Sequence, residues 1–220
     1  PIDLLCIGEG MIELSAPDAD PRQAQTFYKG YGGDALNVAV AARRLGLSVG
    51  FLTRLGDDPF ADNLRELCYL EGVRLEARRQ PGAQTGMYFV QVDAMGERRF
   101  RYYRQGSAAS QLSPDDVTPA LIQGCGMVFA SGIGLALSES SRAAIEKAFR
   151  LAREAGIATA FDINYRPALW PSRSDAKEAF ETVLRLADVA LPSYPDDTFP
   201  LTGLDNAEHV KDYFAAKGAR

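Results

Sequence analysis

The stretch that decides the fold runs Tyr31-Gly-Gly-Asp-Ala-Leu-Asn-Val-Ala-Val-Ala-Ala-Arg-Arg-Leu-Gly46. Two glycines lead into an alanine-rich run without proline, and alanine is the best helix former. Gly46 stands where a helix commonly ends in a left-handed cap. The stretch therefore predicts a loop followed by a helix from about Asp34 to Leu45.

Two glycines and one amide make the start of this helix a candidate binding site. Gly32 and Gly33 lack a β-carbon, so the backbone can pass close to a ligand there. The N-terminus of the helix supplies free N–H groups and a partial positive charge. Asn37 lies about one turn into the helix and can reach a ligand hydroxyl near that end. The alternative is a buried helix after an ordinary turn, since glycine pairs are common in turns.

Composition narrows the class of protein and its partners. A chain of 220 residues is long enough for one sizeable domain with a core. The net charge of −5 argues against nucleic acid as a partner. We find no signal peptide and no apolar run of about 18 residues, so we expect a cytoplasmic protein without membrane contact. Three widely spaced cysteines and one histidine indicate no disulfide framework, zinc site or His-based triad.

Short apolar strands alternate with amphipathic helices along most of the chain. We expect strands near 3–8, 48–55, 73–77, 127–130, 157–161 and 188–191, and helices near 58–71, 138–155, 174–187 and 206–216, with a helix start at 112–116 and a loop at 131–134. This alternation is typical of an α/β fold with a largely parallel sheet, here as one domain over residues 1–220. Gly8-Glu-Gly10 is not a dinucleotide fingerprint, because Glu13 stands where the next glycine is needed. A nicotinamide enzyme is therefore disfavoured.

Residues 80–104 break the alternation. Strand-like runs at 85–93 and 98–104 flank a turn at 94–97 and predict a hairpin. The hairpin is too short for its own core, so we expect it to join strand-like pieces at 11–14 and 23–28. Together they would form a small sheet, with lid strands inserted at about 11–30 and 84–105. Period two places Phe100, Tyr102 and Arg104 on one face, and Tyr88 can face the same space. The alternative is a solvated hairpin whose charges face only water.

A polar loop follows the strand predicted at 157–161. Asp162, Asn164 and Arg166 lie within it, and ligands of open parallel sheets bind beyond the carboxyl ends of the strands. Arg166 presents a planar fork that suits a carboxylate or a phosphate. Alternatively, Asp162 and Arg166 pair with each other and only hold the loop in place.

These motifs together resemble the ribokinase-like (PfkB) carbohydrate kinases. Their N-terminal signature matches Gly32-Gly33-x-Ala35-x-Asn37-x-Ala39, followed by six residues and Gly46, then nine residues and Gly56. Arg101-Tyr-Tyr-Arg-Gln-Gly-Ser-Ala108 and Leu191-Pro-Ser193 are most similar to the 2-keto-3-deoxygluconate kinase branch. Fructokinases share the two-glycine motif and the Asp-x-Asn-x-Arg loop, and they are the alternative. The resemblance implies a three-layer sandwich with a largely parallel central sheet and a small β-sheet lid.

The resemblance also implies an activity and roles for the candidate residues. It implies a kinase that uses ATP and Mg²⁺ to phosphorylate a hydroxyl of a small sugar or sugar acid. The substrate that the resemblance favours is 2-keto-3-deoxygluconate. Sugar hydroxyls would be held by Gly32, Gly33, Asn37 and Asn164, and Tyr88, Tyr102 and Arg104 would close over the sugar. Arg166 would face the acid or the transferring phosphoryl group, and the lid strands would form a homodimer. A non-catalytic sugar-binding protein on the same fold is the alternative from another class.

The chain departs from the family pattern in two places. The family often carries Asn-x-x-Glu near the magnesium and phosphate, whereas the matching positions here are Ser193 and Asp196. By the resemblance, Ser193 would contact the nucleotide, and Asp196 would serve the metal through water. The chain also contains no Gly-Ala-Gly-Asp, whose aspartate is the general base and whose N–H groups form an anion hole. Relatives are longer by roughly 100 residues, so the resemblance implies that the C-terminal part is missing, and we expect the 220-residue chain alone to be inactive.

Overall fold

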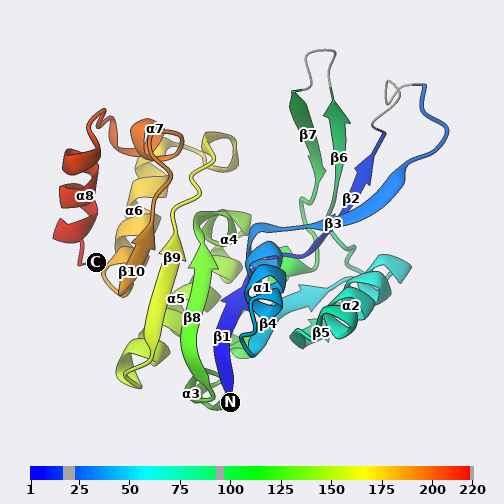
Figure 1. The fold of residues 1–220 in the computed structure, drawn as a ribbon, viewed down its shortest axis with the longest axis horizontal. Coiled ribbons are helices and arrows are strands. Elements are labelled where there is room, and N and C mark those ends of the chain that lie inside the picture. Colours follow the sequence, from blue (N-terminus) through cyan, green and yellow to red (C-terminus); the bar gives the residue numbers. More distant parts are fainter. Residues whose placement is uncertain (17–22, 93–96, 219–220) are drawn as a thin grey trace.

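The structure is a computed structural model that describes residues 1–16, 23–92 and 97–218, and a six-stranded sheet forms its centre (Figure 1). Neighbouring strands all run parallel, in the order β10-β9-β8-β1-β4-β5. The strands are β1 (Ile2–Ile7), β4 (Val49–Leu55), β5 (Arg74–Arg79), β8 (Cys125–Ser131), β9 (Ala158–Asp162) and β10 (Val189–Leu191). The predicted α/β fold with a largely parallel sheet is therefore confirmed.

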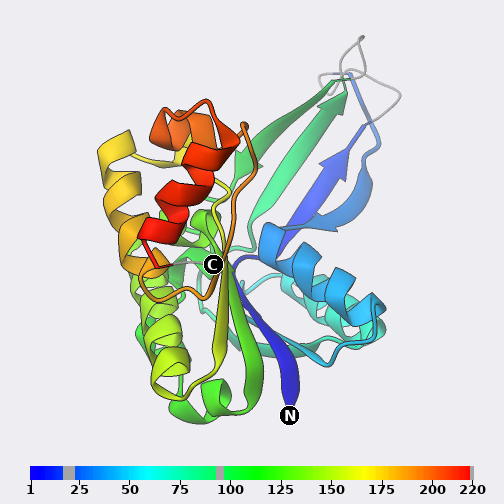
Figure 2. The same cartoon turned by 60° about the vertical axis from the view of Figure 1, so that its left-hand side comes forward.

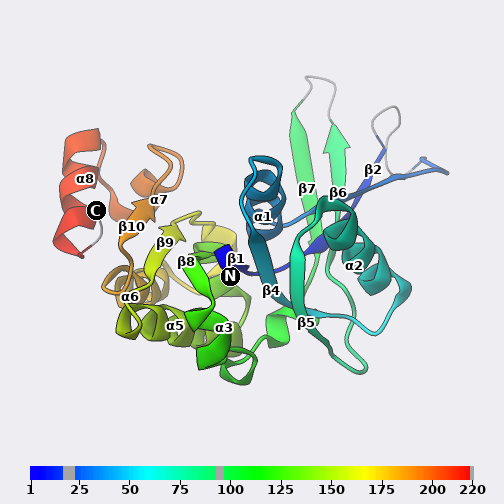
Figure 3. The same cartoon turned by 60° about the horizontal axis from the view of Figure 1, so that its bottom comes forward.

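Helices on both faces of this sheet complete three layers (Figure 3). One face carries α1 and α2, and the other carries α5 and α6, each pair packing on its own cluster of buried apolar side chains. The helices are α1 (Asp34–Arg44), α2 (Pro59–Glu71), α3 (Pro119–Gln123), α4 (Gly132–Leu137), α5 (Glu139–Glu154), α6 (Arg173–Leu184), α7 (Thr198–Thr202) and α8 (Ala207–Ala216). Short 3-10 turns lie at Ala109–Gln111, Pro114–Asp116 and Pro167–Leu169.

The helix predicted from the glycine-led stretch is α1. Its buried side is made of small and apolar residues, Ala35, Leu36, Ala39 and Ala42, which lets the helix lie close to the sheet. Gly33 precedes it with φ 122°, and a β-carbon at Gly33 would collide with the carbonyl oxygen of Glu9. Only glycine therefore fits this close approach of two backbones.

A second sheet of four strands, the lid sheet, projects beyond the carboxyl ends of the central strands (Figure 1). Its order is β3-β2-β6-β7, with β2 and β6 parallel and the outer pairs antiparallel. The strands are β2 (Met11–Ser15), β3 (Tyr28–Gly32), β6 (Met87–Val92) and β7 (Arg98–Tyr103). The hairpin and the early strands thus form one small sheet, as predicted. Residues 94–96 of the predicted turn lie outside the described residues.

Three local predictions were wrong. The strand expected at 23–28 is β3, which begins at Tyr28 and runs directly into the two glycines. Gly32, the last residue of β3, leaves room for the Tyr88 hydroxyl, with which a β-carbon would collide. The loop expected at 131–134 is α4, whose first residue, Gly132, leaves room for the carbonyl of Ile163. The helix start expected at 112–116 is only a 3-10 turn.

The three cysteines, Cys6, Cys68 and Cys125, are free, and all three are buried. Among residues 1–16, 23–92 and 97–218, no helix combines the length and the apolar character needed to cross a membrane.

Candidate active site

Three features meet at one edge of the molecule: the carboxyl ends of the central strands, the first turn of α1 and the base of the lid sheet. Figure 2 shows the lid sheet rising beside this edge, on the side of α1. Asp34, the first residue of α1, acts by its charge on carboxyl groups at both the lid base and the sheet edge. Burial, and in smaller part the negative charge of Asp34, raises the pKa of both Glu9 at the lid base and Asp162 at the sheet edge.

At the lid base, Arg104 forms a buried ion pair with Glu9, which follows β1. The Arg104 Nη2 lies 2.6 Å from the Glu9 Oε2, and the two side chains are 10% and 1% exposed. Ser107 donates a hydrogen bond of 2.6 Å to the other Glu9 oxygen, Oε1. Among the described residues, neither the Nε nor the Nη2 of Arg104 has a hydrogen-bond partner, because the Nη2 meets Glu9 as an ion pair outside hydrogen-bond geometry. Arg104 therefore keeps a donor for a further acceptor, although Glu9 already contacts its guanidinium.

Aromatic side chains cover the same face of the lid sheet. Tyr88 and Tyr102 stand directly opposite each other in β6 and β7, with ring centroids 5.5 Å apart. The Tyr88 hydroxyl donates to the Glu13 Oε2 at 2.6 Å, and the Arg104 guanidinium lies 5.5 Å from the Tyr102 ring centroid. Tyr88 is buried, whereas Tyr102 is 47% exposed. The sequence thus placed Tyr88, Tyr102 and Arg104 on one face correctly.

At the sheet edge, Asp34 joins the end of β8 to the loop after β9. Its Oδ2 accepts a hydrogen bond from the hydroxyl of Ser131, which ends β8, and another from the Asn164 Nδ2 at 3.3 Å. Asn164 has a positive φ of 35°, a conformation that asparagine tolerates better than most residues. The Asp34 carboxylate therefore helps to hold Asn164 in this turn.

Asp162 and Asp197 lie near Arg166 in the same region. Burial raises the pKa of Asp162 to about 6, and the charges of Asp34 and Asp197 act in the same direction. Burial also raises the pKa of Asp197, although the Ser193 backbone N–H donates to its Oδ1 at 2.9 Å. Arg166 lowers both pKa values by its charge, yet within the described residues it forms no ion pair with either carboxylate. The alternative in which Asp162 and Arg166 simply pair is thus not what the structure contains.

The raised pKa of Asp162 predicts how stability depends on pH. Between about pH 4 and 6 the folded protein binds more protons at Asp162 than the unfolded chain, so its free energy of unfolding falls as the pH rises. We expect Asp162→Asn to remove this fall and to stabilise the protein at pH 7 by on the order of 1–2 kcal/mol, after allowance for solvent screening. Urea unfolding from pH 4 to 8 measures the effect. The same change at the exposed Asp115 is the control, and an unchanged pH profile in Asp162→Asn would contradict the prediction.

Other predicted site residues lie farther from this cluster. Asn37 is exposed on α1 and lines a groove against α2 that also includes Tyr31 and Leu67. Ser193 and Asp196 are exposed after β10. It is the next carboxylate, Asp197, that is buried, and its Oδ2 has no hydrogen-bond partner among the residues that the structure describes.

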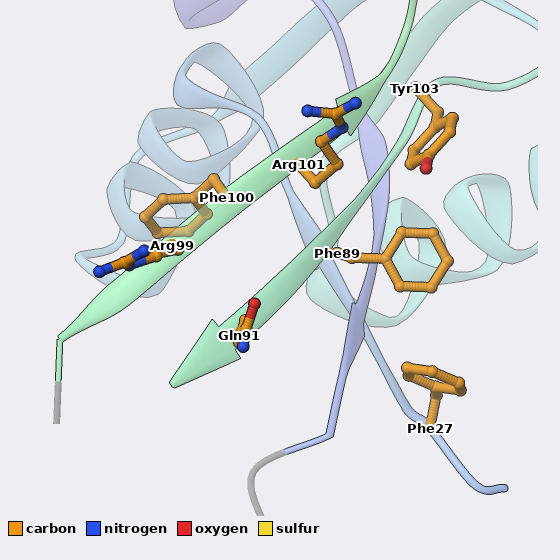
Figure 4. A pocket seen from close by; sticks show the side chains of 7 residues that line it. All are labelled: Phe27, Phe89, Gln91, Arg99, Phe100, Arg101 and Tyr103. Atoms are coloured by element: carbon orange, nitrogen blue, oxygen red, sulfur yellow. The ribbon is translucent and has the colours of Figure 1, made fainter. Parts of the chain in front are cut away.

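The other face of the lid sheet carries a separate hollow of about 420 Å³ (Figure 4). The rings of Phe27, Phe89 and Tyr103 gather there, with centroids of successive rings 5.4 and 5.6 Å apart. Alternation along the strands puts Phe89 and Tyr103 on the side opposite Tyr88 and Tyr102. This hollow is therefore distinct from the cluster around Arg104.

Sequence reasoning missed five residues of the cluster: Glu9, Glu13, Asp34, Ser131 and Asp197. Glu9 and Ser131 each stand at the carboxyl end of a buried strand, and Asp34 follows the glycine pair directly. Those positions were signals that could have found three of them. Glu13 and Asp197 are recognised only from their contacts with Tyr88 and the Ser193 backbone.

The chain belongs to the pfkB family of carbohydrate kinases, whose family model matches residues 2–217. It is 39% identical to a 2-dehydro-3-deoxygluconokinase of Thermoproteus tenax over 95% of this chain and 64% of that protein. It is also 36% identical to Fructokinase-1 of Zea mays, over 84% of this chain and 57% of that protein. The chain thus spans less than two thirds of the length of these relatives.

Solved structures agree on the fold. A PfkB protein from Polaromonas sp. JS666 superposes with a TM-score of 0.93 at 30% identity, over all of this chain and 74% of that one. A fructokinase from Xylella fastidiosa with bound ATP gives a TM-score of 0.87 at 28% identity, over all of this chain and 71% of that one. The ribokinase-like architecture predicted from the sequence is therefore confirmed.

Proposed function

We propose that the full-length protein transfers the γ-phosphate of ATP to a hydroxyl of a small sugar acid, of the 2-keto-3-deoxygluconate type. The observation that carries the choice of a sugar acid is the pair of arginines at the site. Within the part of the chain that the structure describes, Arg104 keeps a buried Nε without a hydrogen-bond partner at the lid base, and Arg166 forms no ion pair with the carboxylates at the sheet edge. Two guanidinium groups suit an anionic substrate better than a neutral one.

The candidate residues divide the work of binding. Gly32 and Gly33 bring the backbone close to the sugar, and Asn164 offers an amide to its hydroxyls. Asn37 offers a second amide where the site extends toward the groove between α1 and α2. Tyr88, Tyr102 and Arg104 close over the sugar from the lid sheet and exclude water, which competes with the sugar as phosphoryl acceptor. Arg166 stabilises negative charge on the acid or on the transferring group.

The residues present fit ATP with Mg²⁺ at the sheet edge. Mg²⁺ prefers oxygen ligands and is commonly held by one or two carboxylates together with phosphates and waters. Among the described residues, Asp197 has a buried oxygen without a hydrogen-bond partner. Asp162 is close enough for the charge of Asp197 to raise its pKa, and Asp196 is the residue before Asp197. These residues would hold the ion through oxygen atoms or water, and Ser193 would contact the nucleotide. When bound, Mg²⁺ supplies positive charge that offsets the charge of the phosphates.

We propose that the general base is an aspartate of a Gly-Ala-Gly-Asp motif outside residues 1–220. We therefore expect the 220-residue chain alone to transfer no phosphate to 2-keto-3-deoxygluconate or fructose. An assay of ADP release with each sugar tests this expectation, with the full-length protein as the positive control. Sugar-dependent ADP release by residues 1–220 would contradict it.

A fructokinase is the second candidate, because relatives of both kinds match the chain at similar identity. The same assay with the full-length protein decides between them: the sugar acid should give the higher kcat/KM. A protein that binds either sugar but releases no ADP would instead be a non-catalytic sugar-binding protein.

We also propose a homodimer that forms through the lid strands. The outer strand β7 is exposed along its length and presents Phe100, Tyr102 and Tyr103. Exposed aromatic side chains on an edge strand are typical of an interface.

A further inference from the structure

Glu9 occupies an unusual position at the joint between the central sheet and the lid sheet. It lies two residues after β1, which ends in buried residues, and its side chain points into the base of the lid sheet. A β-carbon at Gly86 would come within 2.5 Å of the Glu9 Oε1. Residues before and after the lid hairpin, Gly86 and Ser107, thus enclose this carboxylate together with Arg104.

Both oxygens of Glu9 have a close partner. Oε1 accepts a hydrogen bond from Ser107 at 2.6 Å, and Oε2 lies 2.6 Å from the Arg104 Nη2 in an ion pair outside hydrogen-bond geometry. A carboxylate this deeply buried is unfavourable without a charged partner, so the pair persists only if both groups stay in place. The orientation of the Arg104 guanidinium is therefore set from the central sheet.

Fixing Arg104 in advance favours binding of a carboxylate. A free arginine side chain has many rotamers, and ordering it on binding costs affinity. Guanidinium has five N–H donors, and the contact with Glu9 leaves the Nε unpartnered. The negative charge of Glu9 acts in the opposite direction, since it repels a second carboxylate. Whether a mutation at Glu9 weakens or strengthens the binding of a carboxylate depends on which of these two effects is larger.

We propose that Glu9 is a positioning residue, which holds the Arg104 guanidinium at the lid base in the orientation that receives the carboxylate of a sugar acid. This inference rests on the proposed function, because it assumes an acidic sugar at this site. The orienting effect of Glu9 then outweighs its repulsion of the substrate carboxylate.

The test compares Glu9→Gln with wild type in the full-length protein. Isothermal titration with 2-keto-3-deoxygluconate should show affinity weaker by about tenfold or more, the effect of a misplaced charged hydrogen bond. Affinity for fructose should change by less than about threefold, since a neutral sugar has no carboxylate to receive. Ser107→Ala loses one contact to Glu9 and should show a smaller loss of the same kind. Glu208→Gln makes the same chemical change in the exposed ion pair of Glu208 with Lys211 on α8, away from the site, and is the matched control.

Three results would overturn the proposal. Equal loss of both sugars in Glu9→Gln would mean that Glu9 only stabilises the fold. Tighter binding of the sugar acid would mean that repulsion dominates. A crystal structure of Glu9→Gln with Arg104 in its wild-type position would mean that Glu9 does not orient it.

The crystal structure also separates this proposal from the proposed function. If wild-type protein binds fructose but no sugar acid, the proposed substrate is wrong. Displacement of Arg104 in Glu9→Gln would still support the positioning role, and an unmoved Arg104 would still exclude it. If Glu9→Gln does not fold, Ser107→Ala gives the same decision from its own titrations and crystal structure.

Discussion

Replacing Arg104 with alanine in the full-length protein will weaken binding of 2-keto-3-deoxygluconate by roughly 10- to 100-fold, the effect of losing a charged hydrogen-bonding partner. Binding of fructose will change far less. The reason is the buried position of Arg104, whose side chain is only 10% exposed and whose attraction for a carboxylate is therefore little screened by solvent. Titration of each sugar into wild type and Arg104→Ala measures the two changes.

The neighbouring Arg101 provides the matched control. It lies in β7, which ends just before Arg104, but it lines the hollow on the opposite face of the lid sheet, so Arg101→Ala should leave both affinities nearly unchanged. Arg166→Ala should follow Arg104→Ala in its preference for the acid, with a larger effect on kcat if Arg166 also contacts the transferring group. Equal losses of acid and ketose in Arg104→Ala would argue against carboxylate recognition.

The second large effect is expected at Gly33. Gly33→Ala will lower the free energy of unfolding by roughly 3 kcal/mol or more, because it combines two costs. The first is backbone strain at φ 122°, and the second is the collision of the new β-carbon with the Glu9 carbonyl oxygen. Urea unfolding followed by circular dichroism measures the loss.

Gly46→Ala separates the two costs. Gly46 also has a positive φ, of 98°, but a β-carbon there meets nothing within 4 Å. It should therefore lose only about 1–2 kcal/mol, from strain alone. If both substitutions destabilise the protein equally, close approach of the Glu9 backbone is not what requires glycine at position 33.

The elements of the fold were largely predictable because their signals are local. The alanine-rich run after Gly33 forms α1, and the apolar run before Gly8 forms β1. The extension of β3 to Gly32 and the helix α4 were not predictable. Gly32 and Gly132 look like loop residues, but each leaves room for a group from a distant part of the chain, the Tyr88 hydroxyl and the Ile163 carbonyl.

The candidate site shows the same division. Period two at the end of β7 places Tyr102 and the following Arg104 on one face, and the polar residues after β9 mark the sheet edge. The sequence by itself therefore determined these groups, and its motifs indicated the family of the chain. Only the tertiary structure decided their partners. Glu9 meets Arg104, and Asp34 meets Ser131 and Asn164, because the parallel sheet brings the carboxyl ends of separate strands to one edge. Periodicity reports which side of an element a residue occupies, whereas the partner on that side depends on how distant segments pack.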